Sequence, residues 1–245
     1  KKLSPSTARK LLLALAAFRD YLKLYGMELK IDLAELRKIA PKYEHKPSII
    51  EYEEEEDIVG KALSELGKVE TTKYYYGLAA VSFFTGLRST EIIYMVKNWP
   101  ILRKLDLGEV VAVELNYMRK SKKAFITLMP KALAKIIPEL SEVIGDTAFK
   151  NMRDDYGFNV SVMRKAHMAI CSRTMQIHEI DLLQGRLSER HVVAFLKLDL
   201  NIRITIQHYI KHIRSIAEKY VKAYAEFMHI AEKALSKFTE NSKQP

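Results

Sequence analysis

Three arginines lie close to glycines or predicted helix starts, and their chemistry suggests an anionic ligand. They are Arg88, Arg164 and Arg186. A guanidinium group offers a planar fork of donors that can hold two phosphate oxygens at once. Several such forks at one point would be unfavourable without an anion between them. If the fold brings the three together, they predict phosphoryl chemistry on a nucleic-acid backbone.

The overall charge points to the same kind of partner. Among 245 residues, 40 Lys and Arg exceed 30 Asp and Glu, giving a formal charge of +10. Such an excess favours a polyanion, most often nucleic acid, although a Lys- and Glu-rich surface from a heat-loving organism would give a similar balance. Motifs for nucleotide or zinc binding are missing from the sequence, so we expect no cofactor and no metal.

Cys171 is the single cysteine, so neither an intrachain disulfide nor a cysteine-based zinc site is expected. The default compartment is then a reducing cytoplasm. No apolar run reaches the length of a membrane span, and we expect no membrane partner. The chain begins without Met, almost directly in a helical pattern, and we expect it to be a fragment of a longer protein.

The elements that must position the arginines are mostly helical. Leucines from Leu11 to Leu24 follow helical spacing, a second helix is predicted over 31–40, and the polar segment 42–47 reads as a linker. We therefore expect two domains, 1–45 and 46–245. In the second, a helix from Ser48 begins with an acidic run, another spans 72–84, and a third carries Arg88 to about residue 96.

Residues 110–117 and 124–128 are β-rich, and the basic segment 119–123 between them predicts a hairpin with a basic tip. From Lys131 onward the pattern is helical, with interruptions near Gly145, Gly157 and Gly185, and the last helical pattern spans about 205–238. The fold class predicted is mainly α with one small antiparallel sheet. That last pattern can pack on its own domain or on a neighbouring subunit.

The segment Thr85-Gly86-Leu87-Arg88-x-x-Glu91 resembles the first-arginine box of tyrosine recombinases. In that family a helix begins at the arginine, and the acidic residue three positions later helps to orient it. A purely structural Arg–Glu pair at this spacing is the alternative.

A second match makes the resemblance more specific. Arg164-Lys165 is followed by Gln184-Gly185-Arg186, and Arg186 stands 22 positions after Arg164. This order is similar to fusellovirus-type integrases of archaea, in which Arg-Lys opens a helix and a Gln-Gly-Arg turn replaces the usual Leu-Gly-His. The match covers about Pro47 to the C-terminus, and the first 40 residues fit the end of a helical core-binding domain.

The resemblance gives the hairpin a catalytic role. In this family a lysine between the second and third strands protonates the departing 5′ oxygen. Arg119-x-x-Lys122 followed by Phe125 fits the integrase pattern best, so Lys122 is chosen over Lys120 and Lys123. Arg119, Lys120 and Lys123 are then expected to contact DNA.

Two positions depart from the family pattern. Ser161 stands three residues before Arg164, where relatives have His or Lys, and Lys165 or His167 is a candidate replacement for proton transfer. The tyrosine nucleophile should lie nine or ten residues after Arg186, and nine residues on is Phe195, which lacks the attacking hydroxyl.

Three explanations for the missing hydroxyl remain open. Phe195 is the nucleophile position of a variant made inactive or of a naturally inactive relative. Alternatively Tyr209, 23 residues after Arg186, is the nucleophile, or a neighbouring subunit delivers one in trans. The structural alternative for Phe195 is an ordinary core aromatic.

The resemblance implies a site-specific DNA recombinase or integrase that acts through a 3′-phosphotyrosyl intermediate, here in an inactivated form. It also implies double-stranded attachment sites as partner, dimers or tetramers on DNA, and the cytoplasm of a host that carries an archaeal virus or plasmid. A non-catalytic DNA-binding protein on the same fold and a type IB topoisomerase-like enzyme are the alternatives.

Overall fold

A computed structural model describes residues 4–40, 55–119, 122–186 and 202–240. Its contacts divide the chain into two compact units, Lys1–Tyr52 and Glu53–Pro245. Each unit is treated by itself below. The predicted linker over 42–47 and the predicted helix start at Ser48 lie outside the described residues.

The first unit contains two helices, α1 (Pro5–Leu24) and α2 (Leu33–Ile39). The Ser4 hydroxyl accepts a hydrogen bond from the Thr7 amide at the start of α1, and Pro5 occupies the first turn. The Asp32 carboxylate caps α2 in the same way. Both helices agree with the apolar spacing of the sequence.

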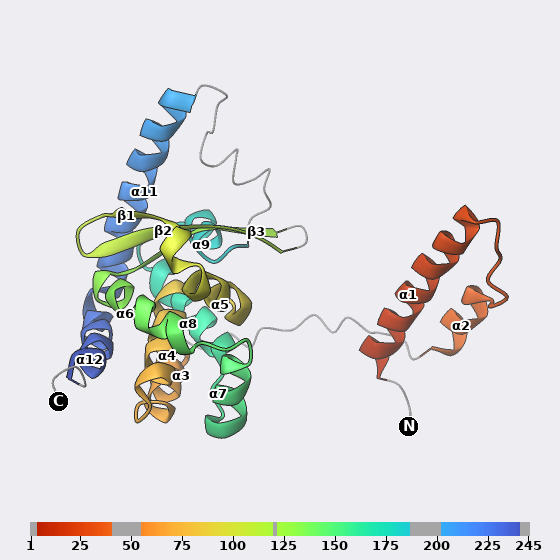
Figure 1. Ribbon diagram of the computed structural model, residues 1–245, viewed down its shortest axis with the longest axis horizontal. Coiled ribbons are helices and arrows are strands. Elements are labelled where there is room, and N and C mark those ends of the chain that lie inside the picture. Colours follow the sequence, from red (N-terminus) through yellow and green to blue (C-terminus); the bar gives the residue numbers. More distant parts are fainter. Residues whose placement is uncertain (1–3, 41–54, 120–121, 187–201, 241–245) are drawn as a thin grey trace. The chain divides into compact units, whose positions relative to one another are not determined.

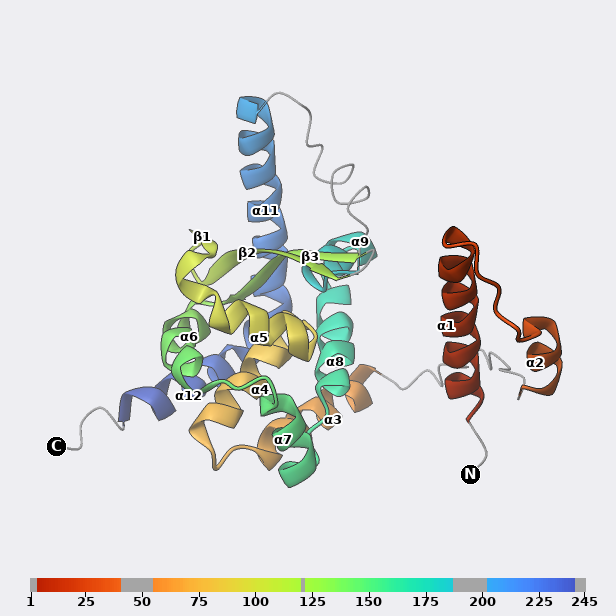
Figure 2. The same cartoon turned by 45° about the vertical axis from the view of Figure 1, so that its right-hand side comes forward.

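The second unit is mainly helical with one small antiparallel sheet, as predicted, and this sheet has three strands (Figures 1 and 2). The sheet has the order β1 (Arg103–Asp106), β2 (Val110–Arg119) and β3 (Lys122–Pro130). The helices are α3 (Glu55–Lys68), α4 (Lys73–Thr85), α5 (Ser89–Lys97), η1 (Trp99–Ile101), α6 (Lys131–Val143), α7 (Ala148–Tyr156), α8 (Val160–Ser172), α9 (Ile177–Leu183), α11 (Ile202–Tyr224), η2 (Ala225–Phe227) and α12 (Met228–Thr239).

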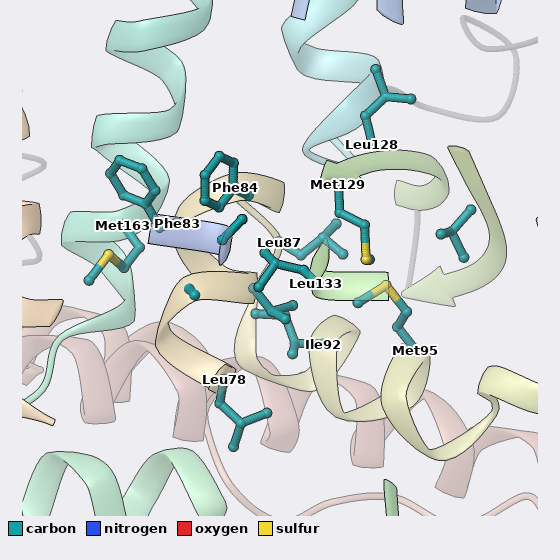
Figure 3. Close-up of a cluster of buried hydrophobic side chains, with 14 of the residues drawn as sticks. Leu78, Phe83, Phe84, Leu87, Ile92, Met95, Leu128, Met129, Leu133 and Met163 are labelled. Carbon is teal, nitrogen blue, oxygen red and sulfur yellow. The ribbon is translucent and has the colours of Figure 1, made fainter. Parts of the chain in front are cut away.

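Helix α4 is the centre of the core. Every residue from Tyr76 to Thr85 is buried, because this stretch is apolar on all sides of the helix. A Cβ on Gly77 would lie 3.2 Å from Phe238 of α12 and 3.3 Å from Ile136 of α6, so these helices approach α4 closely. Figure 3 shows the aromatic end of α4 packed beside side chains of α5, α6, α8 and β3. The C-terminal end of α4 is therefore fixed from several sides.

Two predictions about elements were incomplete. The hairpin has a third strand, β1, which pairs with β2 from Arg103↔Glu114 to Asp106↔Val111. It is only four residues long and mostly exposed, so it carries little apolar alternation. The single last helix is in fact broken at Ala225–Phe227, where the sequence has neither proline nor glycine, and Phe227 is buried against Phe83.

In the parts of the chain that the structure describes, none of the helices combines the length and the apolar character needed to cross a membrane.

Candidate active site

Arg88 lies in the turn between α4 and α5. Gly86 ends α4 with a φ of 57°, and Arg88 occupies the N-cap position of α5. The Arg88 amide donates to Glu91 Oε2 at 2.8 Å, and its Nη1 donates to Glu91 Oε1 at 2.7 Å. Glu91 is almost fully buried, with 2% of its side chain exposed. One carboxylate therefore fixes both the backbone and the guanidinium group of Arg88.

Arg164 reaches the same carboxylate from another helix. The resemblance implied that Arg164 opens a helix, but Arg164 lies in the second turn of α8. Its Nη1 donates to the Gly86 carbonyl at 2.6 Å and lies 3.7 Å from Glu91 Oε2. Its Nη2 is 3.5 Å from the Gln184 carbonyl. Arg164 thus joins the turn before α5 to the turn after α9.

Arg186 follows that second turn. Gly185 has a φ of 61°, and its carbonyl accepts from Arg88 Nη1 at 3.4 Å. Arg186 Nη1 lies 3.4 Å from the sulfur of Met168, which is four residues after Arg164 and hence on the same face of α8. Arg186 therefore contacts the face of α8 that also carries Arg164, and it forms an ion pair with Asp181 at 3.8 Å.

The structure thus brings the three predicted arginines together from three separate segments. Their side chains keep 23% (Arg88), 12% (Arg164) and 31% (Arg186) of their surface exposed. Among the residues that the structure describes, the three guanidinium groups face two carboxylates, Glu91 and Asp181, which leaves an excess of positive charge in this part of the cluster. A partly exposed group of arginines with this balance is suited to binding an anion such as phosphate.

The β2–β3 hairpin approaches the same turn. A Cβ on Gly185 would lie 2.9 Å from the Cα of Ala124 in β3, so the glycine is required by close backbone contact. β3 begins at Lys122, opposite Arg119 and two residues before Ala124. Two residues of strand span about 7 Å. The backbone of Lys122 therefore lies near the Gly185 turn that leads into Arg186.

For several predicted site residues the side chain lies outside the described part of the structure. The side chains of Arg119, Lys122 and Lys123 are not among the described ones, nor is that of Tyr209, whose backbone belongs to α11. Lys120 and Phe195 lie outside the described residues.

His167, a candidate for proton transfer, lies behind the arginines and is completely buried. Its Nδ1 is 2.8 Å from the Tyr224 hydroxyl. Burial, and then the charges of Arg164 and Arg186, lower the pKa of His167 to about 3, so the ring is neutral. A buried neutral ring of this kind has a structural role beside the arginines. Lys165 is exposed on the same helix, as is Ser161.

Three polar residues support the arginines although the sequence assigned them no such role. Gln184 is fully buried, and its Nε2 donates to the Arg164 carbonyl at 3.0 Å. The Tyr220 and Tyr224 hydroxyls donate to the carbonyls of Phe84 and Phe83. The signal available was a glutamine within Leu-Leu-Gln-Gly, and two tyrosines four residues apart on one helix face.

A mainly α unit with a small antiparallel sheet and three converging arginines is consistent with an enzyme of DNA integration. The archaeal phage integrase family matches residues 51–227 of this chain, and the chain belongs to that family. No curated protein and no solved structure matches it. The family match includes the segments of all three arginines and the whole sheet.

Proposed function

We propose that this integrase is of the tyrosine type, binds double-stranded attachment sites and cuts one strand at a time without metal. The observation that supports this most strongly is the convergence of Arg88 and Arg164 on Glu91, next to the Gly185 turn that leads into Arg186. Guanidinium groups placed in this way can hold the non-bridging oxygens of one phosphate and stabilise the charge that develops on the phosphorane.

The remaining roles follow from the chemistry of phosphodiester cleavage. A tyrosine oxygen attacks phosphorus and forms the 3′-phosphotyrosyl bond, while the bond from phosphorus to the 5′ oxygen breaks. Lys122 protonates the departing 5′ oxygen, and its position at the start of β3 beside the Gly185 turn is compatible with this role. Glu91 orients Arg88, and Lys165 is left as the exposed candidate for accepting the tyrosine proton. The reverse reaction joins the exchanged strand.

The nucleophile position is assigned to Phe195, with Tyr209 as the alternative. On this assignment the printed chain binds DNA but does not cleave it, because phenylalanine has no hydroxyl group. Arg119, Lys120 and Lys123 contribute contacts to the DNA backbone. The unit Lys1–Tyr52 is proposed as the end of a helical core-binding domain, and the protein is proposed to act as a dimer or tetramer on DNA in the host cytoplasm.

The test is covalent capture on nicked suicide duplexes of mixed sequence. Four proteins are compared: the printed chain, Phe195→Tyr, Tyr209→Phe and the double variant. We expect a covalent adduct with Phe195→Tyr and with the double variant, and none with the other two. An adduct that requires Tyr209 would instead assign the nucleophile to α11.

The phenylalanine at this position also favours a second candidate, a non-catalytic DNA-binding protein on the same fold. It predicts DNA binding with a steep salt dependence but no adduct even after Phe195→Tyr. Replacing Arg88 by Ala would then lower affinity and reduce the salt slope by about one unit.

A further inference from the structure

One short stretch of α11, residues 219–224, contacts all three segments that carry the arginines. The Lys219 side chain forms an ion pair with Glu179 of α9 at 2.7 Å, and the Lys219 carbonyl accepts from the Thr174 hydroxyl at 2.8 Å. The Tyr224 hydroxyl lies 2.8 Å from His167 of α8. α9 leads into Arg186, and α8 carries Arg164.

The contact with the third segment is the most specific. The last carbonyls of a helix lack partners within the helix. At the end of α4 the Phe83 carbonyl accepts from the Tyr224 hydroxyl at 2.8 Å, and the Phe84 carbonyl accepts from the Tyr220 hydroxyl at 2.7 Å. Both tyrosines are fully buried. These two carbonyls stand four and five residues before Arg88.

The same layer fixes the turn that follows. The Tyr224 and Phe84 rings pack with centroids 4.8 Å apart, and the Tyr220 and Tyr224 rings lie 4.7 Å apart. His167 lies against Gly86, where an added Cβ would be only 2.5 Å from its ring. The turn from α4 to Arg88 is therefore held between the α11 tyrosines, His167 and Arg164.

We propose that Tyr220 and Tyr224 are positioning residues for the arginine cluster. Docking of α11 through their two hydroxyl groups sets the turn that places Arg88. The inference rests on the proposed function for its catalytic consequence, whereas its geometric part concerns Arg88 alone. It also links the arginines to α11, the helix that begins after the segment containing the proposed nucleophile position.

The test uses Tyr220→Phe, Tyr224→Phe and the double variant, with Tyr76→Phe as the matched control. Tyr76 is also buried, with 3% exposed, but lies near the start of α4, away from the turn. The first readout is the Nε–Hε NMR signal of Arg88, assigned by its loss in Arg88→Lys. We expect this signal to shift and broaden in the α11 variants and to stay unchanged in Tyr76→Phe.

The second readout is a cycle of variants in the Phe195→Tyr protein. An unsatisfied buried carbonyl should slow adduct formation about tenfold in Tyr224→Phe. With Arg88 already replaced by Ala, the same substitution should add less than about a twofold effect, because the two residues act as a unit.

The outcomes separate this inference from the proposed function. An unchanged Arg88 signal in both single variants overturns the inference, as does an equal change in Tyr76→Phe. If the double variant does not fold, the single variants decide. A shifted Arg88 signal without any adduct from any variant leaves the positioning role supported and contradicts the proposed nucleophile chemistry.

Discussion

The stability of the second unit should depend on pH through His167. The unfolded imidazole binds a proton below its ordinary pKa of 6.5, whereas the buried ring stays neutral down to about 3. Between these values the unfolded state binds more protons than the folded state. The stabilisation contributed by the neutral ring is therefore complete above pH 6.5 and is lost as the pH falls toward 3.

The size of the effect follows from the same shift. Each pH unit of acidification lowers the free energy of unfolding by about 1.4 kcal/mol where the unfolded state binds one proton more than the folded state. Acidification from pH 6.5 by about two units should then lower the free energy of unfolding by about 2 kcal/mol through His167 alone, because the unfolded imidazole is only half protonated at the start. Glu70 and Asp106, whose pKa values are lowered by Lys233 and Lys131, act in the same direction at lower pH. The contribution of His167 must therefore be measured as a difference in stability between the parent and a His167 variant.

The assay is urea unfolding, followed by circular dichroism across this pH range, of the parent, His167→Asn and the control His229→Asn. His229 is exposed and lies in α12. The stability advantage of the parent over His167→Asn should shrink on acidification by the amount above, while the control follows the parent. A pH-independent advantage, or an NMR titration of His167 near 6.5, would refute the reasoning.

Three further substitutions test the site. Gly185→Ala would press a Cβ against Ala124 at 2.9 Å with φ at 61°, and should cost about 2 kcal/mol in urea unfolding and weaken DNA binding in a mobility-shift assay. Glu91→Gln removes the carboxylate that Arg88 shares with a second arginine, and should cost about 3 kcal/mol, with sulfate raising its melting temperature more than that of the parent. Gly86→Ala should cost at least about 2 kcal/mol in thermal unfolding, because its Cβ would overlap the His167 ring, and normal stability would contradict that packing.

Local features of the fold were predictable because their causes are local. Gly86 with its positive φ ends α4, and the Arg–Glu spacing that follows starts α5 at Arg88, both of which the sequence indicates directly. β1 was missed because four mostly exposed residues give no clear period. The break before Met228 was missed because tertiary packing of Phe227, rather than a helix-breaking residue, accompanies it.

The convergence of the site was less accessible from the sequence. The bond from Arg164 to Gly86 joins residues 78 apart, and that from Tyr220 to Phe84 joins residues 136 apart. No short-range pattern encodes such contacts. Only the resemblance to a family indicated that the three arginines belong to one site. The buried state of His167 likewise depends on α11, which reaches it from 57 residues away.

The charges of the cluster explain why the layer beneath it is neutral. A protonated His167 would place a fourth cation in a buried position next to Arg164 and Arg186, which already lower its pKa. His167, Gln184, Tyr220 and Tyr224 instead supply hydrogen bonds without adding charge. Among the described residues, Glu91 and Asp181 balance only part of the positive charge of the three arginines. On the proposed function, an incoming phosphate at the exposed parts of the arginines would supply the missing negative charge.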